Sequence, residues 1–194
     1  MNNQSLMVAL VVDTNDPDVL GRVLIELPAL PEGPRLWASV VSPLAGDNRG
    51  QYCLPEVGDE VLAAFTDGTL SSAYVLGGLW GKQKPPPEEA DKDANSIKLF
   101  RTRSGNTMIF DDTDGSEKIV FRDKNENSIE ILTGDDRIAI NVKGNVEIYA
   151  KKTIILEGQK ISLKAETIEM KADSSLSLDG GGTAELKAGT VNIN

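Results

Sequence analysis

From Ile138 to Asn194 the chain repeats a triplet of an apolar residue, any residue and a second apolar residue, at steps of 8, 8, 7, 7, 8, 8 and 7 residues. Between the triplets lie Gly, Asn, Asp, Ser and Lys, which include the common turn-forming residues. Side chains alternate between the two sides of a strand, so the apolar pair of each triplet points one way and the middle residue the other. The pattern predicts one very short strand and one corner per repeat.

We call the predicted inward-facing positions the seam. A seven-residue step is also typical of heptad helices, but heptads place apolar residues about 3 and 4 apart, and residues 2 apart lie about 200° apart around a helix. The helical alternative therefore fails. The seam comprises Ile138, Ile140, Val146, Ile148, Ile154, Leu156, Ile161, Leu163, Ile168, Met170, Leu176, Leu178 and Leu186.

The small number of seam residues per repeat limits the architecture. Two apolar side chains can line only one edge of a narrow prism, whereas a single-chain β-solenoid uses about 18 to 25 residues to close one rung. Either one chain closes a rung every three repeats, or three chains intertwine and each supplies one side. The seam by itself leaves both architectures open.

The same pattern continues upstream with wider spacing. Steps of 9, 10, 11 and 11 residues lead back from Ile138, and the Asp- and Asn-rich segments 111–115 and 123–127 predict turns between the strands. We therefore expect a needle over residues 97–194 with repeats of 7 to 11 residues. The upstream pairs are Ile129 and Ile131, Ile119 and Phe121, Met108 and Phe110, and Ile97 and Leu99.

The first 82 residues have a different organisation. Five apolar segments separated by Pro, Gly, Asp and Asn predict a small closed barrel of the OB type. Residues 83–96 are rich in proline, which lacks an amide donor, so they are expected to be an extended linker. The fold class predicted is all-β. The barrel strands are expected at Leu6–Asp13, Leu20–Leu27, Leu36–Ser42, Glu60–Phe65 and Ala73–Leu79.

Several segments, spread over roughly residues 8 to 87, resemble the OB domain of baseplate spike proteins, a family that includes phage baseplate assembly protein V and the VgrG spikes of type VI secretion. A later segment resembles the entry of such proteins into their β-helix. The segments are Gly21–Pro28, Leu36–Val41, Leu54–Leu62, Phe65 with Asp67 and Gly68, and Val75–Trp80, followed by Ser104–Asp112 and Lys118–Ile119.

This resemblance implies a homotrimer with an OB collar above a triple-stranded, intertwined β-helical needle. It also implies a structural, non-enzymatic central spike that binds baseplate hub and tube proteins and contacts the target membrane transiently as it punctures the envelope. Two departures are expected: the chain starts at the OB domain without the large hub-like region of VgrG, and it lacks the lysozyme domain of some phage spikes. Its size resembles that of a minimal spike.

Composition bears on the chemistry that is open to the chain. The sequence has no histidine, so His-activated Ser or Cys nucleophiles and His-ligated metals are excluded. We expect no catalytic residues, cofactor or metal. The one cysteine, Cys53, is expected to be a buried or half-buried thiol, and Trp37 and Trp80 to pack in core and collar.

The alternative function is an OB-fold nucleic-acid-binding protein with a solenoid tail. Such binding needs a basic groove with stacking aromatic residues. The formal net charge of −10 lies wholly in residues 1–137, because seven Lys balance seven Asp and Glu after them. We therefore expect no nucleic-acid partner. A glycosidase would need paired buried carboxylates, whereas the outward Glu and Asp of the repeats alternate with Lys.

The two ends of the sequence bear on where the protein is made and on what binds the end of the needle. The apolar run Leu6–Val12 is too short to span a bilayer and lacks the basic start of a signal peptide, so synthesis in the cytoplasm is expected. The resemblance to baseplate spike proteins implies assembly into a phage tail or tail-like particle. At the other end the repeats persist to Val191 and Ile193. These two residues are predicted to dock a separate tip protein that resembles the PAAR-repeat cones of VgrG spikes.

Overall fold

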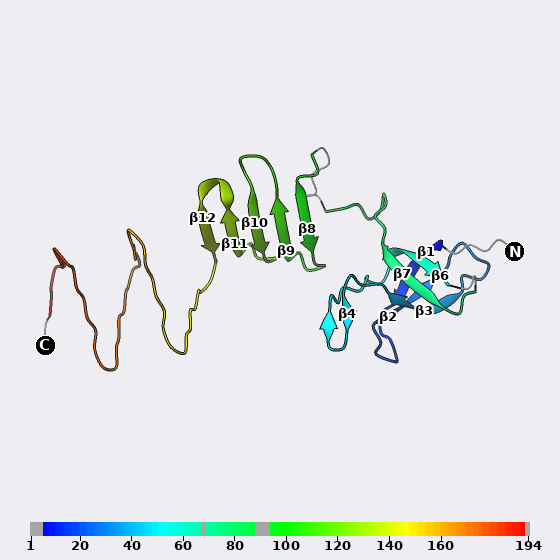
Figure 1. Cartoon of the computed structure of the whole chain (residues 1–194), viewed down its shortest axis with the longest axis horizontal. Coiled ribbons are helices and arrows are strands. Elements are labelled where there is room, and N and C mark those ends of the chain that lie inside the picture. Colours follow the sequence, from blue (N-terminus) through cyan, green and yellow to red (C-terminus); the bar gives the residue numbers. More distant parts are fainter. Residues whose placement is uncertain (1–5, 67–68, 88–93, 193–194) are drawn as a thin grey trace. The chain divides into compact units, whose positions relative to one another are not determined.

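The protein is described by a computed structural model that covers residues 6–66, 69–87 and 94–192. By its internal contacts the chain separates into residues 1–145 and 146–194. The described structure is all-β, as predicted (Figure 1). Its elements are β1 (Leu6–Asp13), β2 (Arg22–Glu26), β3 (Arg35–Val40), β4 (Ala45–Gly46), β5 (Arg49–Gly50), β6 (Glu60–Phe65), β7 (Ala73–Gly78), β8 (Ile97–Arg101), β9 (Thr107–Asp111), β10 (Lys118–Arg122), β11 (Ser128–Leu132), the 3₁₀ turn η1 (Thr133–Asp135) and β12 (Arg137–Asn141).

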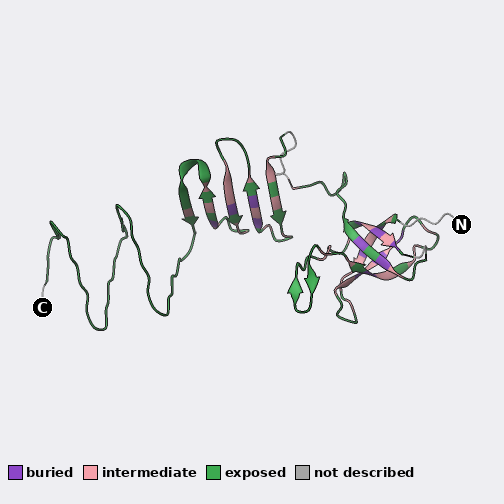
Figure 2. Cartoon of the chain, in the orientation of Figure 1, coloured by how far each residue is buried: buried purple, intermediate pink, exposed green. Residues whose placement is uncertain are grey.

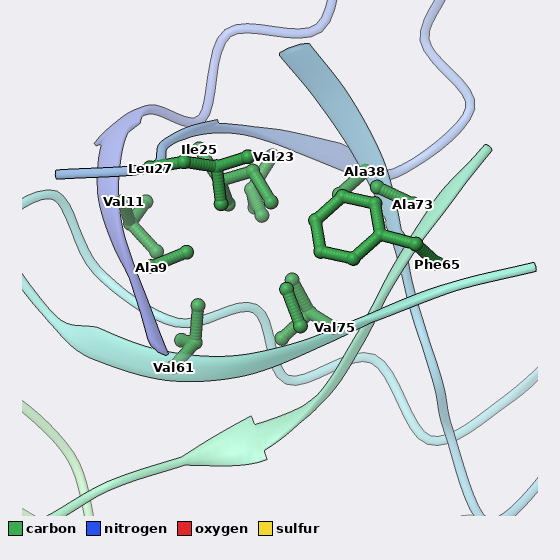
Figure 3. Close-up of a cluster of buried hydrophobic side chains, with 11 residues drawn as sticks. Ala9, Val11, Val23, Ile25, Leu27, Ala38, Val61, Phe65, Ala73 and Val75 are labelled. Atoms are coloured by element: carbon green, nitrogen blue, oxygen red, sulfur yellow. The ribbon is translucent and has the colours of Figure 1, made fainter. Parts of the chain in front are cut away.

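Five strands close into a barrel in the order β1-β2-β3-β7-β6. All neighbours are antiparallel except β3 and β7, which are parallel. Alternate residues of each strand point inward, which is the period expected for a barrel with a packed interior. The predicted closed barrel is confirmed. Figure 3 shows its core, which consists of Ala9, Val11, Val23, Ile25, Leu27, Ala38, Val61, Ala63, Phe65, Ala73 and Val75.

The connection between β1 and β2 is held by Asp16. Its carboxylate accepts hydrogen bonds from the backbone N–H groups of Asp18, Leu20 and Arg22 and pairs with the Arg22 guanidinium at 2.7 Å. The bond from the Arg22 side chain, together with the backbone bonds, holds the pKa of Asp16 far below its ordinary value. Arg22 also lies over the ring of Trp37, 5.8 Å from its centroid. Trp37 is half-buried and is not a member of the barrel core, to which its neighbour Ala38 belongs.

A hairpin that the sequence did not predict projects between β3 and β6. We call residues 42–52, which contain β4 and β5, the arm. The Ser42 hydroxyl lies 2.9 and 2.7 Å from the carbonyl oxygens of Leu44 and Gln51 and ties the two ends together. Gly50 has a φ of 146°, and a Cβ there would lie 2.5 Å from the Leu44 carbonyl oxygen, so only glycine fits.

Cys53 and Trp80 are both more exposed than the sequence predicted. Cys53 is exposed and not buried, because it lies in the irregular segment that follows the arm. Trp80, expected to be packed, is 74% exposed just after the end of β7.

The predicted linker lies partly outside the described residues, which stop at Pro87 and resume at Ala94. Its start is tied to the barrel, since Lys84 Nζ lies 2.9 Å from Asp59.

Strands β8 to β12 form a five-stranded antiparallel meander, in the order β12-β11-β10-β9-β8 (Figure 1). Turns such as Asp123–Asn127 connect strands of 5 residues each. The predicted pairs from Met108 to Ile140 fall on one face. Ile97 and Leu99 do not: β8 pairs Lys98 with Phe110 and Phe100 with Met108, so Ile97 and Leu99 lie on the other face.

Residues 146–192 run back and forth as extended segments joined by bends (Figure 1). The bends and turns fall at residues 151–152, 158–159, 166, 173–174, 181–182 and 189, each one repeat apart, and each extended segment between them carries one predicted triplet. The corners fall at the predicted spacing, whereas the short strand predicted for each repeat stays a prediction. No strand is assigned among these residues in the single chain.

Candidate oligomerisation surface

One face of the β8–β12 sheet is apolar and open. The register aligns its side chains in two rows across the strands, which we call the apolar rows. Most are 40 to 68% exposed, unusual for contiguous large apolar side chains. One row contains Phe110, Ile119, Ile131 and Ile138, and the other contains Phe100, Met108, Phe121, Ile129 and Ile140.

The opposite face of the same sheet is more polar and yet better shielded. Ile109 and Val120 are 8 and 7% exposed there, because charged side chains that include Lys118 and Glu130 line the hollow around them. The Lys118 ammonium lies 3.5 Å from the Asp111 carboxylate. A single chain thus covers its mixed face and leaves its apolar face to solvent, the reverse of the arrangement expected for a finished monomer.

The predicted seam residues continue this exposure beyond the sheet. Ile138 and Ile140 lie on β12 within the apolar rows, opposite Ile131 and Ile129. From Val146 to Leu186 every seam residue is between 51 and 79% exposed, and no residue from Ile129 to Asn192 is buried. Figure 2 shows the contrast with the barrel, whose interior is buried. The seam residues from Val146 to Leu186 are therefore left exposed by their own chain.

The backbone of residues 146–192 makes few hydrogen bonds. Among these described residues, the one backbone–backbone bond joins the Gly182 N–H to the Gly180 carbonyl, and the Gly181 N–H donates to the Asp179 carboxylate at 2.9 Å. Ordering a residue costs about 1–2 kcal/mol of conformational entropy, which hydrogen bonds and apolar burial must offset. Within the single chain, this segment gains little of either.

A repeated hydrogen bond links the corners at one edge of the sheet. The Asn106 side-chain oxygen accepts from the Lys124 N–H at 3.1 Å, and the Asn127 side-chain oxygen accepts from the Lys143 N–H at 2.9 Å. Asp123 accepts from the Asn127 side chain and from the N–H groups of Asn125 and Asn127, and these bonds lower its pKa. Each corner is thereby fixed to the next.

Ion pairs and hydrogen bonds lower two further pKa values around the sheet. A hydrogen bond from Lys143, 2.8 Å away, lowers the pKa of Glu126. A bond from Thr113 followed by the nearby Lys118 charge lowers that of Asp111. These carboxylates stabilise turns while ionised, and their fixed geometry is structural.

The structure describes one of the two predicted tip-docking residues. Val191 is 46% exposed, whereas Ile193 lies outside the described residues. Within the described ranges no group of three or more Cys, Asp or Glu side chains could hold a metal ion, and no helix has the length and hydropathy to cross a bilayer.

Comparison with known families bears on the barrel. Residues 7–80 match the sequence model of the type VI secretion system/phage-baseplate injector OB domain. Residues 7–80 are thus similar to this domain, and we call them the injector OB domain after that similarity. This match spans β1 to β7, so the predicted OB barrel and the resemblance to baseplate spike proteins are confirmed.

A curated relative extends the similarity beyond the injector OB domain. The chain is 26% identical over 128 residues to the type VI secretion system spike protein VgrG3 of Vibrio cholerae serotype O1. The alignment covers 59% of this chain and 13% of that protein. The chain therefore spans a small part of this relative.

Proposed function

We propose that this protein is the non-enzymatic central spike of a contractile tail or injection-system baseplate, acting as a homotrimer. Three chains intertwine over residues 97–194, so that each contributes its apolar rows and seam to one side of a triple-stranded β-helical needle. The single observation that carries the proposal is the exposed seam, in a segment whose extended path is nearly without internal hydrogen bonds. Among the two architectures left open by the sequence, it favours three chains, because a chain that closed its own rungs would bury these residues.

The mechanism is mechanical. In the trimer, backbone groups pair between chains at every repeat and the seam becomes a continuous apolar core, which gives a narrow rod its stiffness. Contraction of the surrounding particle drives this rod through the target envelope, so its contact with the membrane is transient. The injector OB domain joins the needle to the hub and tube proteins, and a PAAR-like tip protein covers the far end.

The oligomeric state tests this proposal directly. Light scattering of the purified full chain should give about 62 kDa, three times the chain mass of 20.8 kDa. Negative-stain images should show a narrow rod at one end of each particle. A folded, monodisperse species of one chain mass would overturn the proposal. Deleting the gene from the producing strain should yield particles that contract without killing, and the full chain supplied in trans should restore killing.

A further inference from the structure

The barrel carries an apolar surface that its own core does not use. Side chains of β1, β6 and β7 that point outward form this surface, which we call the outer wall. Leu6 lies in register with Ala64 and Ala64 with Tyr74, while Val8 lies in register with Leu62. No member is charged, and four are between 39 and 53% exposed. The outer wall consists of Leu6, Val8, Leu62, Ala64, Tyr74 and Leu76.

A second apolar surface belongs to the arm. Leu44 and Tyr52 are 55 and 77% exposed, and Leu20, on the loop before β2, is 70% exposed. These three residues line one open hollow with the rest of the arm. The Tyr52 ring lies against Gly21, where an added Cβ would be 3.3 Å from its Cε2 atom. The arm is thus an ordered projection, and Leu44 and Tyr52 form an exposed apolar surface on it together with Leu20.

The barrel topology places these two surfaces on different sides. The outer wall is centred on β6, whose neighbours are β1 and β7. The arm begins just after β3 and contacts the residue before β2, and β2 and β3 are the two strands that complete the barrel opposite β6. A chain with two unlike apolar surfaces on opposite sides is suited to a head-to-tail contact that closes into a ring.

We infer that, in the trimer, the arm of each protomer packs on the outer wall of the next, so that the three barrels form a closed collar. The occupant of the outer wall is a second copy of this chain, and the inference rests on the proposed trimer. Three identical contacts of this kind bury both surfaces in every chain. Uncharged, apolar residues at the centre of the contact match the composition of stable interfaces.

The native Cys53, which is exposed and directly follows the arm, provides the test. In the full chain, Leu76→Cys places a second thiol on the outer wall, and a short bis-maleimide linker should join Cys53 of one protomer to the new thiol of the next. The expected product is a covalent trimer on a denaturing gel. Val8→Cys, at the other margin of the outer wall, serves as a second version. The matched control is Ala29→Cys, an exposed site on the turn after β2, which should give no covalent trimer.

The outcomes separate this inference from the proposed function. Suppose that light scattering gives a trimer, but both wall variants yield no cross-linked product or only products linked within one chain. This result would overturn the collar and would not contradict the proposed spike function. A monomeric chain would overturn both. Leu44→Asp should reduce linking at least tenfold while the mass stays trimeric, because the needle holds the chains together. If Leu44→Asp leaves linking unchanged, or if a hub protein binds the outer wall of the intact trimer, the arm is not the occupant.

Discussion

The side-chain oxygen of Asn127 accepts a hydrogen bond from the backbone N–H of Lys143 at 2.9 Å. Asn106 makes the same bond to the Lys124 N–H one corner earlier. In each case a polar side chain from one turn satisfies a backbone group of the next turn on the same edge. The spacing of the turns along this edge of the β8–β12 sheet is therefore set by side chains as well as by the strand ladder.

The first prediction removes this link. Asn127→Ala deletes the bond to Lys143 and the bond from its own side chain to Asp123, which should cost about 1–2 kcal/mol per chain. Denaturant unfolding of the full chain measures the loss. Asn125→Ala is the control, because Asn125 contributes its backbone N–H to Asp123 and should change stability little. Equal effects of the two substitutions would contradict a specific role for the Asn127 side chain.

A second prediction concerns acid. The pKa of Asp123 is lowered from 3.8 by the Asn127 side chain and nearby N–H groups. A lowered folded-state pKa contributes stability that is present above the unfolded value and is lost as the pH falls through the folded value. Melting temperatures should therefore decline below about pH 4. Asp123→Asn should lie below the wild type at pH 7, and the gap should narrow as the pH falls from 4 to 2; a constant gap would exclude the carboxylate as its source.

The third prediction addresses the barrel core. Ile25 is fully buried, so Ile25→Ala removes packed methyl groups and leaves a cavity, at a cost of about 2–5 kcal/mol. Its neighbour Leu24 points to the other side of β2 and is partly exposed, so Leu24→Ala should cost clearly less. Chemical denaturation followed by Trp37 fluorescence reports on the barrel. Similar losses for both residues would contradict the assigned inward face.

Much of the barrel could be predicted because its strands alternate clearly and end at strong breakers. The bounds of β1 and β6 agree with the sequence prediction at both ends. The arm could not be predicted, since its two short strands depend on the Ser42 hydroxyl and on a φ of 146° at Gly50, neither of which leaves a periodic pattern. Cys53 and Trp80 were misjudged because residue type alone does not report whether a neighbouring element covers a side chain.

The register of β8 shows how a repeat can be misread by one residue. Ile97, Leu99 and Phe100 are all apolar, so either alternation fits the sequence. The turn decides between them: the Thr102 N–H donates to the Asn106 carbonyl and the Gly105 N–H to the Thr102 carbonyl, each at 2.9 Å. These bonds set Arg101 opposite Thr107 and turn Phe100 toward the apolar rows. The seam positions after Val146 stay a prediction, because a single chain shows their exposure and not their partner.

The fourth prediction tests the seam in the assembled spike. Leu163→Asp should place three unpaired carboxylates around one axis, each costing about 2 kcal/mol or more, so the trimer should fail to form. Ser162→Asp introduces the same charge at the middle, outward-facing position of the same triplet and should leave assembly intact. Light scattering and yield of the soluble chain distinguish the two. Normal trimers from Leu163→Asp would refute an inward-facing seam.

The last prediction concerns the distal end of the needle. The triplet that begins at Val191 is predicted to dock a PAAR-like tip protein, because open strand edges favour pairing with another protein. A PAAR-like tip protein should therefore be retained by the full chain in co-purification. A chain that stops at Ala188 lacks the final triplet, and it should form trimers of normal stability but lose the tip. Retention of the tip by both forms in equal amount would show that docking does not use Val191 and the residues after it.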